Sequence, residues 1–326
     1  MRILICLLPP LLVFLCFHLT GKAVGLLWTP ARHAATMAGG VAASLTFLAF
    51  LYGSTYGLLR LEVHRQTIRL DRLPAAFRGY RIVHLSDWHL GTFADDLGPV
   101  RRVVDSVNAL KPDLIVFTGD IVNSRSDELQ PFLAELSRLH APDGVYAVQG
   151  NHDYCTYRRR STPQEQARDA AEVVRLERQC GFRVLQNEHH LIHRGGDTLA
   201  LVGTEHIGKP PFPRKGKLQK ALQALPPHLC TVLLSHDPSH WRMEVLPHTD
   251  IDLTLSGHTH AMQLQVGQWS PVQWLYPEWG GLYSEQGRHL YVSTGIGGVA
   301  PFRLGAWPSF SLLELQPASA PPHTRE

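Results

Sequence analysis

The sequence predicts an α/β fold preceded by a membrane anchor, and three observations support this prediction. Short apolar, β-branched stretches alternate with segments of helical periodicity beyond residue 80. Polar residues follow most of these apolar stretches, at the point where a strand would pass into a loop. The first 59 residues contain only three charged side chains, Arg2, Lys22 and Arg32. Because alternating strands and helices favour sheets covered by helices, we predict an α/β domain after the anchor.

The anchor consists of two apolar segments, residues 3–19 and 34–59, without a charged side chain. A membrane-spanning helix needs about 20 mostly apolar residues. The second segment is long enough, whereas the first is near the limit and contains Pro9 and Pro10. We predict two transmembrane helices in an anchor over 1–59, a linker over 60–79, a catalytic domain over 80–316 and a flexible tail over 317–326. A cleaved signal peptide is the alternative for the first segment, although no small-residue cleavage site follows it.

The domain is expected to contain eight strands and three long helices. The strands are predicted over 81–86, 113–118, 144–149, 198–203, 231–234, 251–255, 289–293 and 311–315. The helices are predicted over 95–111, 127–140 and 164–181, where apolar residues recur at helical spacing. Residues 262–288 are rich in aromatic residues but keep no single period, so we expect a long loop there. Three interpretations of this loop stay open: it lines an apolar groove, rests on a bilayer surface, or packs on the sheet.

Five predicted strands end in residues that commonly bind metals. The motifs are Asp87-Trp88-His89, Gly119-Asp120, Gly150-Asn151-His152-Asp153, Ser235-His236-Asp237 and Gly257-His258-Thr259-His260. Ligands gather at the carboxyl ends of strands in open α/β sheets, so we expect these side chains to converge. A single Asp after a strand is more often a helix or turn cap, but five such motifs in series indicate a metal site. Mixed carboxylate, imidazole and carboxamide donors suit Mn²⁺, Fe²⁺ or Zn²⁺.

The order of these motifs resembles that of the calcineurin-like metallophosphoesterase family, over roughly residues 80–315. The resemblance implies a β-sandwich flanked by helices on both sides and two divalent metal ions, Mn²⁺, Fe²⁺ or Zn²⁺. The residue roles that it implies are as follows: Asp87, His89 and His260 bind the first ion, Asn151, His236 and His258 bind the second, and Asp120 bridges them. It also implies that His152 is catalytic, stabilising the transition state and protonating the leaving oxygen.

One position departs from the pattern that is usual in phosphoprotein phosphatases. In those enzymes an Asp three residues after the bridging Asp orients the catalytic His, and here this position is Asn123. Asp153 or a backbone carbonyl is then left to set the tautomer of His152.

Substrate-binding residues are predicted in two segments. Arg158 and Arg159, in a run of three arginines after the Asn-His-Asp motif, are placed to bind a second phosphate. A solvated charged face is the alternative. Residues 295–303 resemble a segment of the membrane-anchored branch of the family, and Arg303 is expected to face the phosphoryl group, with an ordinary surface arginine as the alternative.

Charge and cysteine usage restrict the partners and the compartment. Three of the 31 basic residues lie in the anchor, so residues 60–326 contain 28 basic and 28 acidic residues. Because this part of the chain has no excess of positive charge, we expect no nucleic-acid partner. Arg60, Arg65 and Arg69 follow the second apolar segment, which by the positive-inside rule favours a cytoplasmic domain. The three cysteines outside the anchor are Cys155, Cys180 and Cys230, an odd number that fits a reducing compartment.

The resemblance implies a membrane-anchored phosphoesterase, similar to the bacterial branch that includes the UDP-2,3-diacylglucosamine pyrophosphatases of lipid A synthesis. We therefore expect an enzyme of the bacterial inner membrane that hydrolyses a phosphoester or pyrophosphate bond in a phosphorylated small molecule, membrane lipid or nucleotide-sugar lipid precursor. The alternatives are a non-catalytic, metal-stabilised membrane scaffold and a secreted or periplasmic phosphoesterase. The natural substrate, the metal used in the cell and the oligomeric state stay open.

Overall fold

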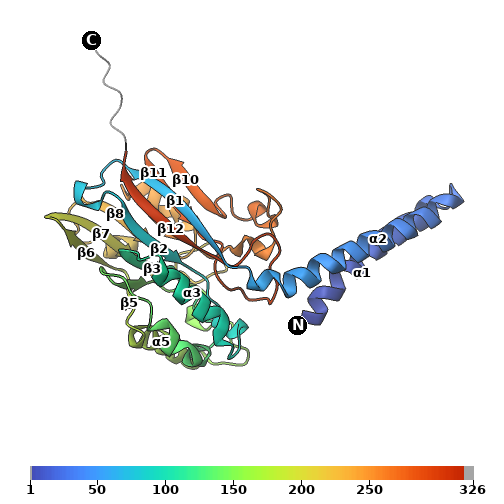
Figure 1. Cartoon of the computed structure of the whole chain (residues 1–326), viewed down its shortest axis with the longest axis horizontal. Coiled ribbons are helices and arrows are strands. Elements are labelled where there is room, and N and C mark those ends of the chain that lie inside the picture. Colours follow the sequence, from blue (N-terminus) through green and yellow to red (C-terminus); the bar gives the residue numbers. More distant parts are fainter. Residues whose placement is uncertain (1, 319–326) are drawn as a thin grey trace, which may run out of the picture.

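The computed structural model describes residues 2–318 and shows a helical hairpin that leads into a two-sheet domain (Figure 1). The hairpin consists of α1 (Arg2–Val24) and α2 (Thr29–Ser54). Helix α1 continues through Pro9 and Pro10. Both helices are long and apolar enough to cross a membrane, and their large apolar side chains are mostly exposed outside the hairpin, as lipid-facing side chains would be.

The domain contains two six-stranded sheets. The first sheet has the order β1 (Glu62–Leu70), β12 (Ser309–Pro317), β2 (Tyr80–Leu85), β3 (Leu114–Phe117), β4 (Val145–Ala147) and β5 (Arg183–Val184). The second has the order β10 (Gly281–Glu285), β11 (Arg288–Val292), β9 (Leu253–Ser256), β8 (Cys230–Leu234), β7 (Asp197–Gly203) and β6 (Glu188–Arg194). Strands β2, β3 and β4 run parallel in the first sheet, as do β7, β8, β9 and β11 in the second.

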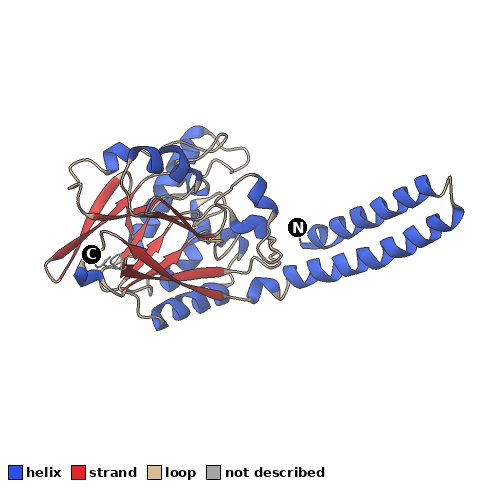
Figure 2. Cartoon of the chain, turned by 90° about the horizontal axis from the view of Figure 1, so that it is seen from above, coloured by secondary structure: helices blue, strands red, loops and turns tan. Residues whose placement is uncertain are grey.

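Helices cover the outer face of each sheet, as Figure 2 shows. The two inner faces share one apolar core that includes Ile82, Val116, Val232 and Leu255. Helices α3 (Leu97–Ala109) and α5 (Pro163–Gln179) pack on the first sheet through a second core. The short turns α6 (Leu218–Ala221), η6 (Trp241–Val245) and α7 (Leu246–His248) accompany the second sheet. The predicted α/β sandwich with helices on both sides is therefore confirmed.

Two predicted elements need correction. Residues 60–79 are not a simple linker, because β1 pairs in parallel with β12 from Glu62 to Leu70 and buries Ile68 and Leu70 between the sheets. Residues 127–140 do not form one helix, because a 3₁₀ segment, η4 (Ser126–Phe132), precedes the single turn α4 (Leu133–Leu136). Pro131 lies inside η4 and lacks a backbone N–H. The predicted tail begins within β12, and its residues from 319 on lie outside the described part of the chain.

The expected loop over 262–288 is largely confirmed, although its last part forms β10, which pairs with β11. Before β10 the segment contains two 3₁₀ turns, η7 (His260–Gln263) and η8 (Pro271–Trp274). The remaining short turns are η1 (Gly57–Leu59), η2 (Ala75–Phe77), η3 (Leu90–Thr92) and η5 (His152–Tyr154). Turn η3 follows the first metal-type motif directly, whereas η5 and η7 begin within theirs, at His152 and His260.

Candidate metal centre

The loops that follow the parallel strands of both sheets meet at one place. Within the first sheet, the Asp87 backbone N–H donates to the Gly119 carbonyl over 2.9 Å. Within the second, the Gly257 N–H donates to the His236 carbonyl over 2.9 Å. The two sheets are joined there, because Nδ1 of His236 donates to the Thr118 carbonyl over 2.7 Å. The fifth predicted strand end joins them, because the His152 backbone N–H donates to Oδ1 of Asp120 over 2.8 Å.

The backbone at this place is left-handed at residues other than glycine. The φ angles are 55° at Asp87, 47° at His89, 60° at Asp120, 74° at His258 and 50° at His260. Such angles are uncommon for these residue types and persist only where surrounding contacts impose them, often at functional sites. They turn His258 and His260, which alternate in sequence, toward two neighbouring clusters instead of opposite faces of a strand.

Gly257 permits this approach by having no side chain. A Cβ atom there would collide with the Ser86 hydroxyl and the Asp87 carboxylate. The absence of that atom lets the His258 backbone N–H donate to both Asp87 carboxylate oxygens at 3.1 Å. The strand end containing Asp87 is thereby held against the one containing His258.

The first cluster contains Asp87, His89, Asp120 and His260, which offer ligand atoms within 4.8 Å of one another. Nε2 of His260 lies 3.1 Å from Nε2 of His89 and 3.4 Å from Oδ1 of Asp87. Nε2 of His89 is 3.6 Å from Oδ2 of Asp120. Two facing imidazole nitrogens and two carboxylates at these distances form a donor set that a divalent cation fits.

The second cluster contains His206, His236 and His258. Nδ1 of His258 lies 3.2 Å from Nε2 of His236, and Nε2 of His236 lies 3.1 Å from Oδ2 of Asp120. Asp120 therefore touches both clusters. Asn151 contributes a buried Oδ1 atom without a hydrogen-bond partner among the described residues, while its amide nitrogen donates to the Tyr157 hydroxyl over 2.9 Å.

Backbone carbonyls determine which imidazole nitrogen is free at three of the histidines. A carbonyl can only accept, so Nδ1 of His236 donates to Thr118 and Nδ1 of His206 donates to Pro213, in each case over 2.7 Å. When either ring is neutral, its Nε2 atom carries no proton and can act as a ligand. Nε2 of His206 is buried and has no hydrogen-bond partner among the described residues, as expected of an atom that binds a metal ion.

His152 is oriented in the same way. Its Nδ1 donates to the backbone carbonyl of Asn123 over 2.6 Å, so the carbonyl, and not Asp153, holds the ring. Asp153 instead accepts backbone N–H bonds of 2.8 Å from Asp120, Ile121 and Gly150. The residue that departs from the phosphatase pattern thus still positions His152, through its main chain.

Burial shapes the protonation of these groups in the metal-free protein. It lowers the pKa of His89 and of His206 to about 3, so both rings are neutral, the form in which imidazole binds metals. Burial also lowers the pKa of His236, but the Asp120 carboxylate outweighs it and raises that pKa to about 10. Burial alone would raise the pKa of Asp120, whereas His236 and His152 hold it well below its usual range. A cation can take over the role of the His236 proton, and the residues therefore fit a divalent metal.

One of the predicted substrate residues, Arg303, lies differently from the expectation. Arg303 is fully buried, and its guanidinium donates to the backbone carbonyls of Thr294, Gly297 and Ala306. Because these donors are occupied, Arg303 stabilises its own loop and does not face a phosphoryl group. Arg158 forms an ion pair of 2.6 Å with Asp169, and Arg159 is exposed. Phosphate binding by these two arginines stays a prediction.

Three residues at the site were not predicted. His206 follows the predicted strand over 198–203, so the same strand-end pattern that indicated the other ligands could have indicated it. The Tyr276 hydroxyl lies 2.9 Å from Nε2 of His258. The Tyr157 ring centroid lies 4.3 Å from that of His152, so Tyr157 forms a wall beside the proposed catalytic ring. No sequence pattern indicates the two tyrosines, because their contacts arise from loop folding.

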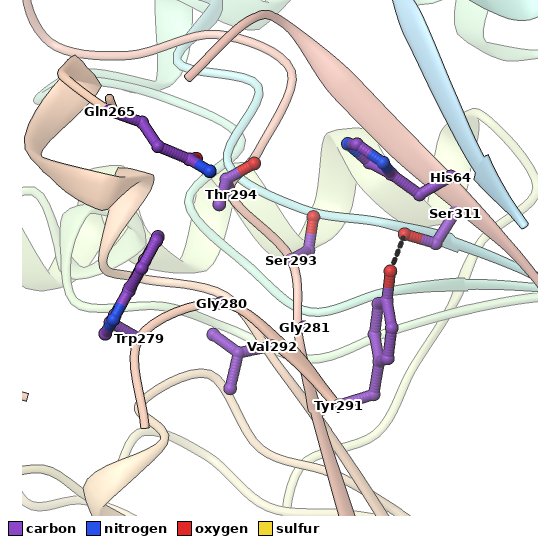
Figure 3. A pocket seen from close by; sticks show the side chains of 10 residues that line it. All are labelled: His64, Gln265, Trp279, Gly280, Gly281, Tyr291, Val292, Ser293, Thr294 and Ser311. Carbon is purple, nitrogen blue, oxygen red and sulfur yellow. Dashed lines mark hydrogen bonds between the residues drawn. The ribbon is translucent and has the colours of Figure 1, made fainter. Parts of the chain in front are cut away.

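A separate cavity of about 220 Å³ lies between the edge strands of the two sheets, as Figure 3 shows. It is lined by His64 of β1, Gln265, Trp279 and residues of β10 to β12, and the Tyr291 hydroxyl bonds that of Ser311 over 2.8 Å. None of the predicted ligands lines it, so it is distinct from the metal centre.

Comparison with known proteins agrees with this geometry. The profile of the calcineurin-like phosphoesterases matches residues 80–262. The uncharacterized metallophosphoesterase YkuE of Bacillus subtilis is 29% identical, over 85% of this chain and 95% of its own length. The UDP-2,3-diacylglucosamine pyrophosphatase LpxG of Chlamydia trachomatis is 27% identical, over 84% and 97%. A transmembrane protein with metallophosphoesterase domain from Bos taurus is 32% identical over 77% of this chain and 56% of its own length.

Proposed function

We propose, from the premise that this chain belongs to the calcineurin-like phosphoesterase family, that it hydrolyses a phosphoester or pyrophosphate bond with two divalent metal ions. One observation carries the proposal: Asp120 lies between the two clusters. Its Oδ2 atom is 3.6 Å from Nε2 of His89 and 3.1 Å from Nε2 of His236. A carboxylate in that position can bridge two cations and offset their repulsion.

The first ion would be held by Asp87, His89, His260 and the bridging Asp120, and the second by Asp120, Asn151, His236 and His258. We add His206 to the second set, because its free Nε2 atom belongs to the same cluster as the ligand atoms of His236 and His258. The donors are oxygen and imidazole nitrogen without thiolate, a set that suits Mn²⁺, Fe²⁺ or Zn²⁺. Two such ions, when bound, polarise the phosphoryl oxygen and neutralise charge that develops in the transition state.

His152 would donate a proton to the leaving oxygen. Nδ1 is engaged by the Asn123 carbonyl, so Nε2 is the atom that can exchange a proton with the substrate. The backbone N–H of His152 donates to Oδ1 of Asp120 over 2.8 Å, which holds the ring beside the bridging carboxylate. Tyr157 packs against the ring and limits its rotation.

The substrate would be a membrane lipid or a nucleotide-sugar lipid precursor, such as UDP-2,3-diacylglucosamine. Two features support this: the apolar hairpin indicates membrane association, and the LpxG relative is a pyrophosphatase of that compound by name. We place the hairpin, over residues 1–59, in the bacterial inner membrane and the domain on its cytoplasmic side. An acylated substrate would then reach the site from the same membrane.

The test is metal-dependent hydrolysis by the full chain purified in detergent. We expect Mn²⁺ to restore turnover of bis-p-nitrophenyl phosphate and of UDP-2,3-diacylglucosamine after chelation. Hydrolysis of bis-p-nitrophenyl phosphate alone would support phosphoesterase activity and reject UDP-2,3-diacylglucosamine as the substrate. The chain could instead bind two ions but hydrolyse neither compound, nor any lipid that accumulates in cells lacking the protein. This outcome would favour the non-catalytic scaffold.

A further inference from the structure

The loop over 262–275 exposes an unusual amount of apolar surface. Its exposed residues are Met262, Val266, Trp269, Trp274 and Leu275, which we call the apolar rim. Trp274 is 75% exposed and Val266 66% exposed. Residues 262–275 contain no charged side chain, although 18% of the whole chain is charged. An exposed, uncharged segment rich in tryptophan is expected at an interface and not in free contact with water.

The rim is concentrated at one place on the domain. In the described part of the chain beyond residue 60, eight large apolar residues are exposed. Five of them form the apolar rim, and the other three are Val63, Tyr157 and Val299. The Trp269 and Trp274 rings pack edge to face with centroids 5.8 Å apart, and Val266 pairs with Trp269 through backbone hydrogen bonds. Five of eight such residues therefore belong to a single structured loop.

This loop is tied directly to the membrane hairpin. The Gln265 N–H donates to the Leu304 carbonyl over 2.8 Å, and the neighbouring Arg303 N–H donates to the Gly53 carbonyl of α2 over 3.0 Å. The Phe302 ring also stacks on Phe50 of α2, with centroids 4.7 Å apart. Figure 1 shows the orange segment that contains the rim on the side of the domain from which the hairpin extends.

The same loop also borders the metal centre. His260 lies just before it, and Tyr276, just after it, places its hydroxyl 2.9 Å from Nε2 of His258. The positively charged side chain of Lys209 lies at the edge of the loop, where its ammonium group donates to the Leu275 carbonyl over 3.4 Å. The loop therefore connects the catalytic residues to the membrane side of the domain.

We infer that the apolar rim enters the headgroup region of the bilayer that contains the hairpin, and that it seats the metal centre against that surface. A lipid could then bring its phosphorylated head to the site while its acyl chains stay in the bilayer. Tryptophan favours this region because its ring is apolar and its N–H is polar, and Lys209 can face lipid phosphates. The inference about lipid access rests on the proposed function, whereas the seating of the rim does not.

The seating is tested with the full chain in nanodiscs that contain lipids brominated near the headgroup. We expect these lipids to quench part of the tryptophan fluorescence, and we expect that part to shrink in the double variant Trp269→Phe and Trp274→Phe. Trp28, in the hairpin turn, gives a background common to both proteins. Equal quenching of the two proteins would overturn the inference. If the rim is instead a contact between two copies, cross-linking will trap dimers and quenching will be equal.

The consequence for access is tested with the triple variant Val266→Ser, Trp274→Ser and Leu275→Ser. We expect the ratio of turnover on a lipid substrate in vesicles to turnover on bis-p-nitrophenyl phosphate to fall about tenfold or more, because the membrane contact loses three apolar side chains that the bilayer would otherwise bury. The control is Gln268→Ser, which alters an exposed polar residue of the same loop. An unchanged ratio would reject a role in access. If the unaltered chain hydrolyses none of these substrates, the proposed function is rejected. The quenching experiment would still test whether the rim contacts the bilayer.

Discussion

At the scale of single residues, Asp120 is the position on which both clusters depend. We expect Asp120→Asn to remove most turnover and to reduce the bound metal from two ions per chain, because the amide no longer offsets the repulsion between two cations. Metal analysis and turnover of the purified variant check this. The control is Asp197→Asn, since Asp197 accepts a bond from the Ala76 N–H far from the cluster. Two tightly bound ions with normal turnover in Asp120→Asn would remove Asp120 from the bridge.

His206 provides a test of the enlarged ligand set. We expect His206→Ala to weaken binding of one ion by at least about 10-fold, since its buried Nε2 is proposed as a ligand. Binding isotherms with Mn²⁺ should show one site preserved and one weakened. His84→Ala is the matched control, because His84 is equally buried but bonds the Thr118 hydroxyl in the core. Full affinity for both ions together with slower turnover would instead assign His206 to the substrate.

His152 should affect the chemical step and not the metal. We expect His152→Ala to lower kcat by about 10²- to 10⁴-fold on a substrate with a poor leaving group, as for loss of a general acid. Both ions should stay bound. The loss should be smaller for a p-nitrophenyl ester, whose leaving group scarcely needs a proton. An equal loss for both substrates would contradict proton donation by His152.

Residue types were easier to predict than residue conformations. Asp87, His258 and the other proposed ligands stand directly after apolar stretches, so their convergence followed from the rule for strand ends. Their left-handed backbone could not be predicted, because contacts between distant loops impose it. The expectation for Arg303 failed for a similar reason. Its three carbonyl partners come together only when residues 294–306 close into a loop.

At the scale of elements, the eight inner strands of the two sheets were predicted and the four edge strands β1, β5, β6 and β10 were not. Residues 62–70 carry several exposed polar side chains, since β1 pairs only with β12 and exposes part of its surface. Its two buried residues, Ile68 and Leu70, are too few to form a clear alternating pattern. Helix α5 was predicted well from its apolar residues at helical spacing. The structure adds a capping box at its start, formed by Thr162 and Glu165.

Helix α5 also carries a buried carboxyl group that should limit stability at neutral pH. Glu177 is fully buried, and its carboxylate oxygens have no hydrogen-bond partner among the described residues. Burial, with the charge of Asp153, raises its pKa well above the ordinary value of 4.5. The unfolded chain ionises above that value while the folded chain stays protonated, so this group favours folding at low pH and that contribution is lost as the pH rises.

We therefore expect Glu177→Gln to stabilise the protein at pH 7 to 8 by about 1–3 kcal/mol, a gain that should disappear near pH 4. Thermal unfolding in detergent at both pH values measures it. Glu172→Gln on the same helix is the control, because Glu172 is paired with Arg175 near the surface and its loss should change Tm little. A gain that is equal at both pH values would show that packing, and not ionisation, is responsible.

At the scale of the whole molecule, the hairpin and the domain are connected in a way that determines which chain ends share a side. The start of α1 and the end of α2 both lie next to the domain, where the Cys6 thiol is 3.6 Å from the Ser54 hydroxyl. Trp28 belongs to the turn between α1 and α2. Figure 2 shows this turn at the end of the hairpin that is far from the domain. If the hairpin spans a membrane, the domain and the start of α1 are on one face and Trp28 is on the other.

Arg60, Arg65 and Arg69 lie on the domain side, so the positive-inside rule predicts a cytoplasmic domain. We expect a fluorescent protein fused after Glu326 to be bright and alkaline phosphatase fused there to be inactive. Fusions after Trp28 should give the opposite pattern, which controls for expression and for insertion of α1. Active phosphatase after Glu326, with inactive phosphatase after Trp28, would place the domain outside. A cytoplasmic nucleotide-sugar substrate would then be excluded, and the periplasmic phosphoesterase would become the better interpretation of the same metal centre.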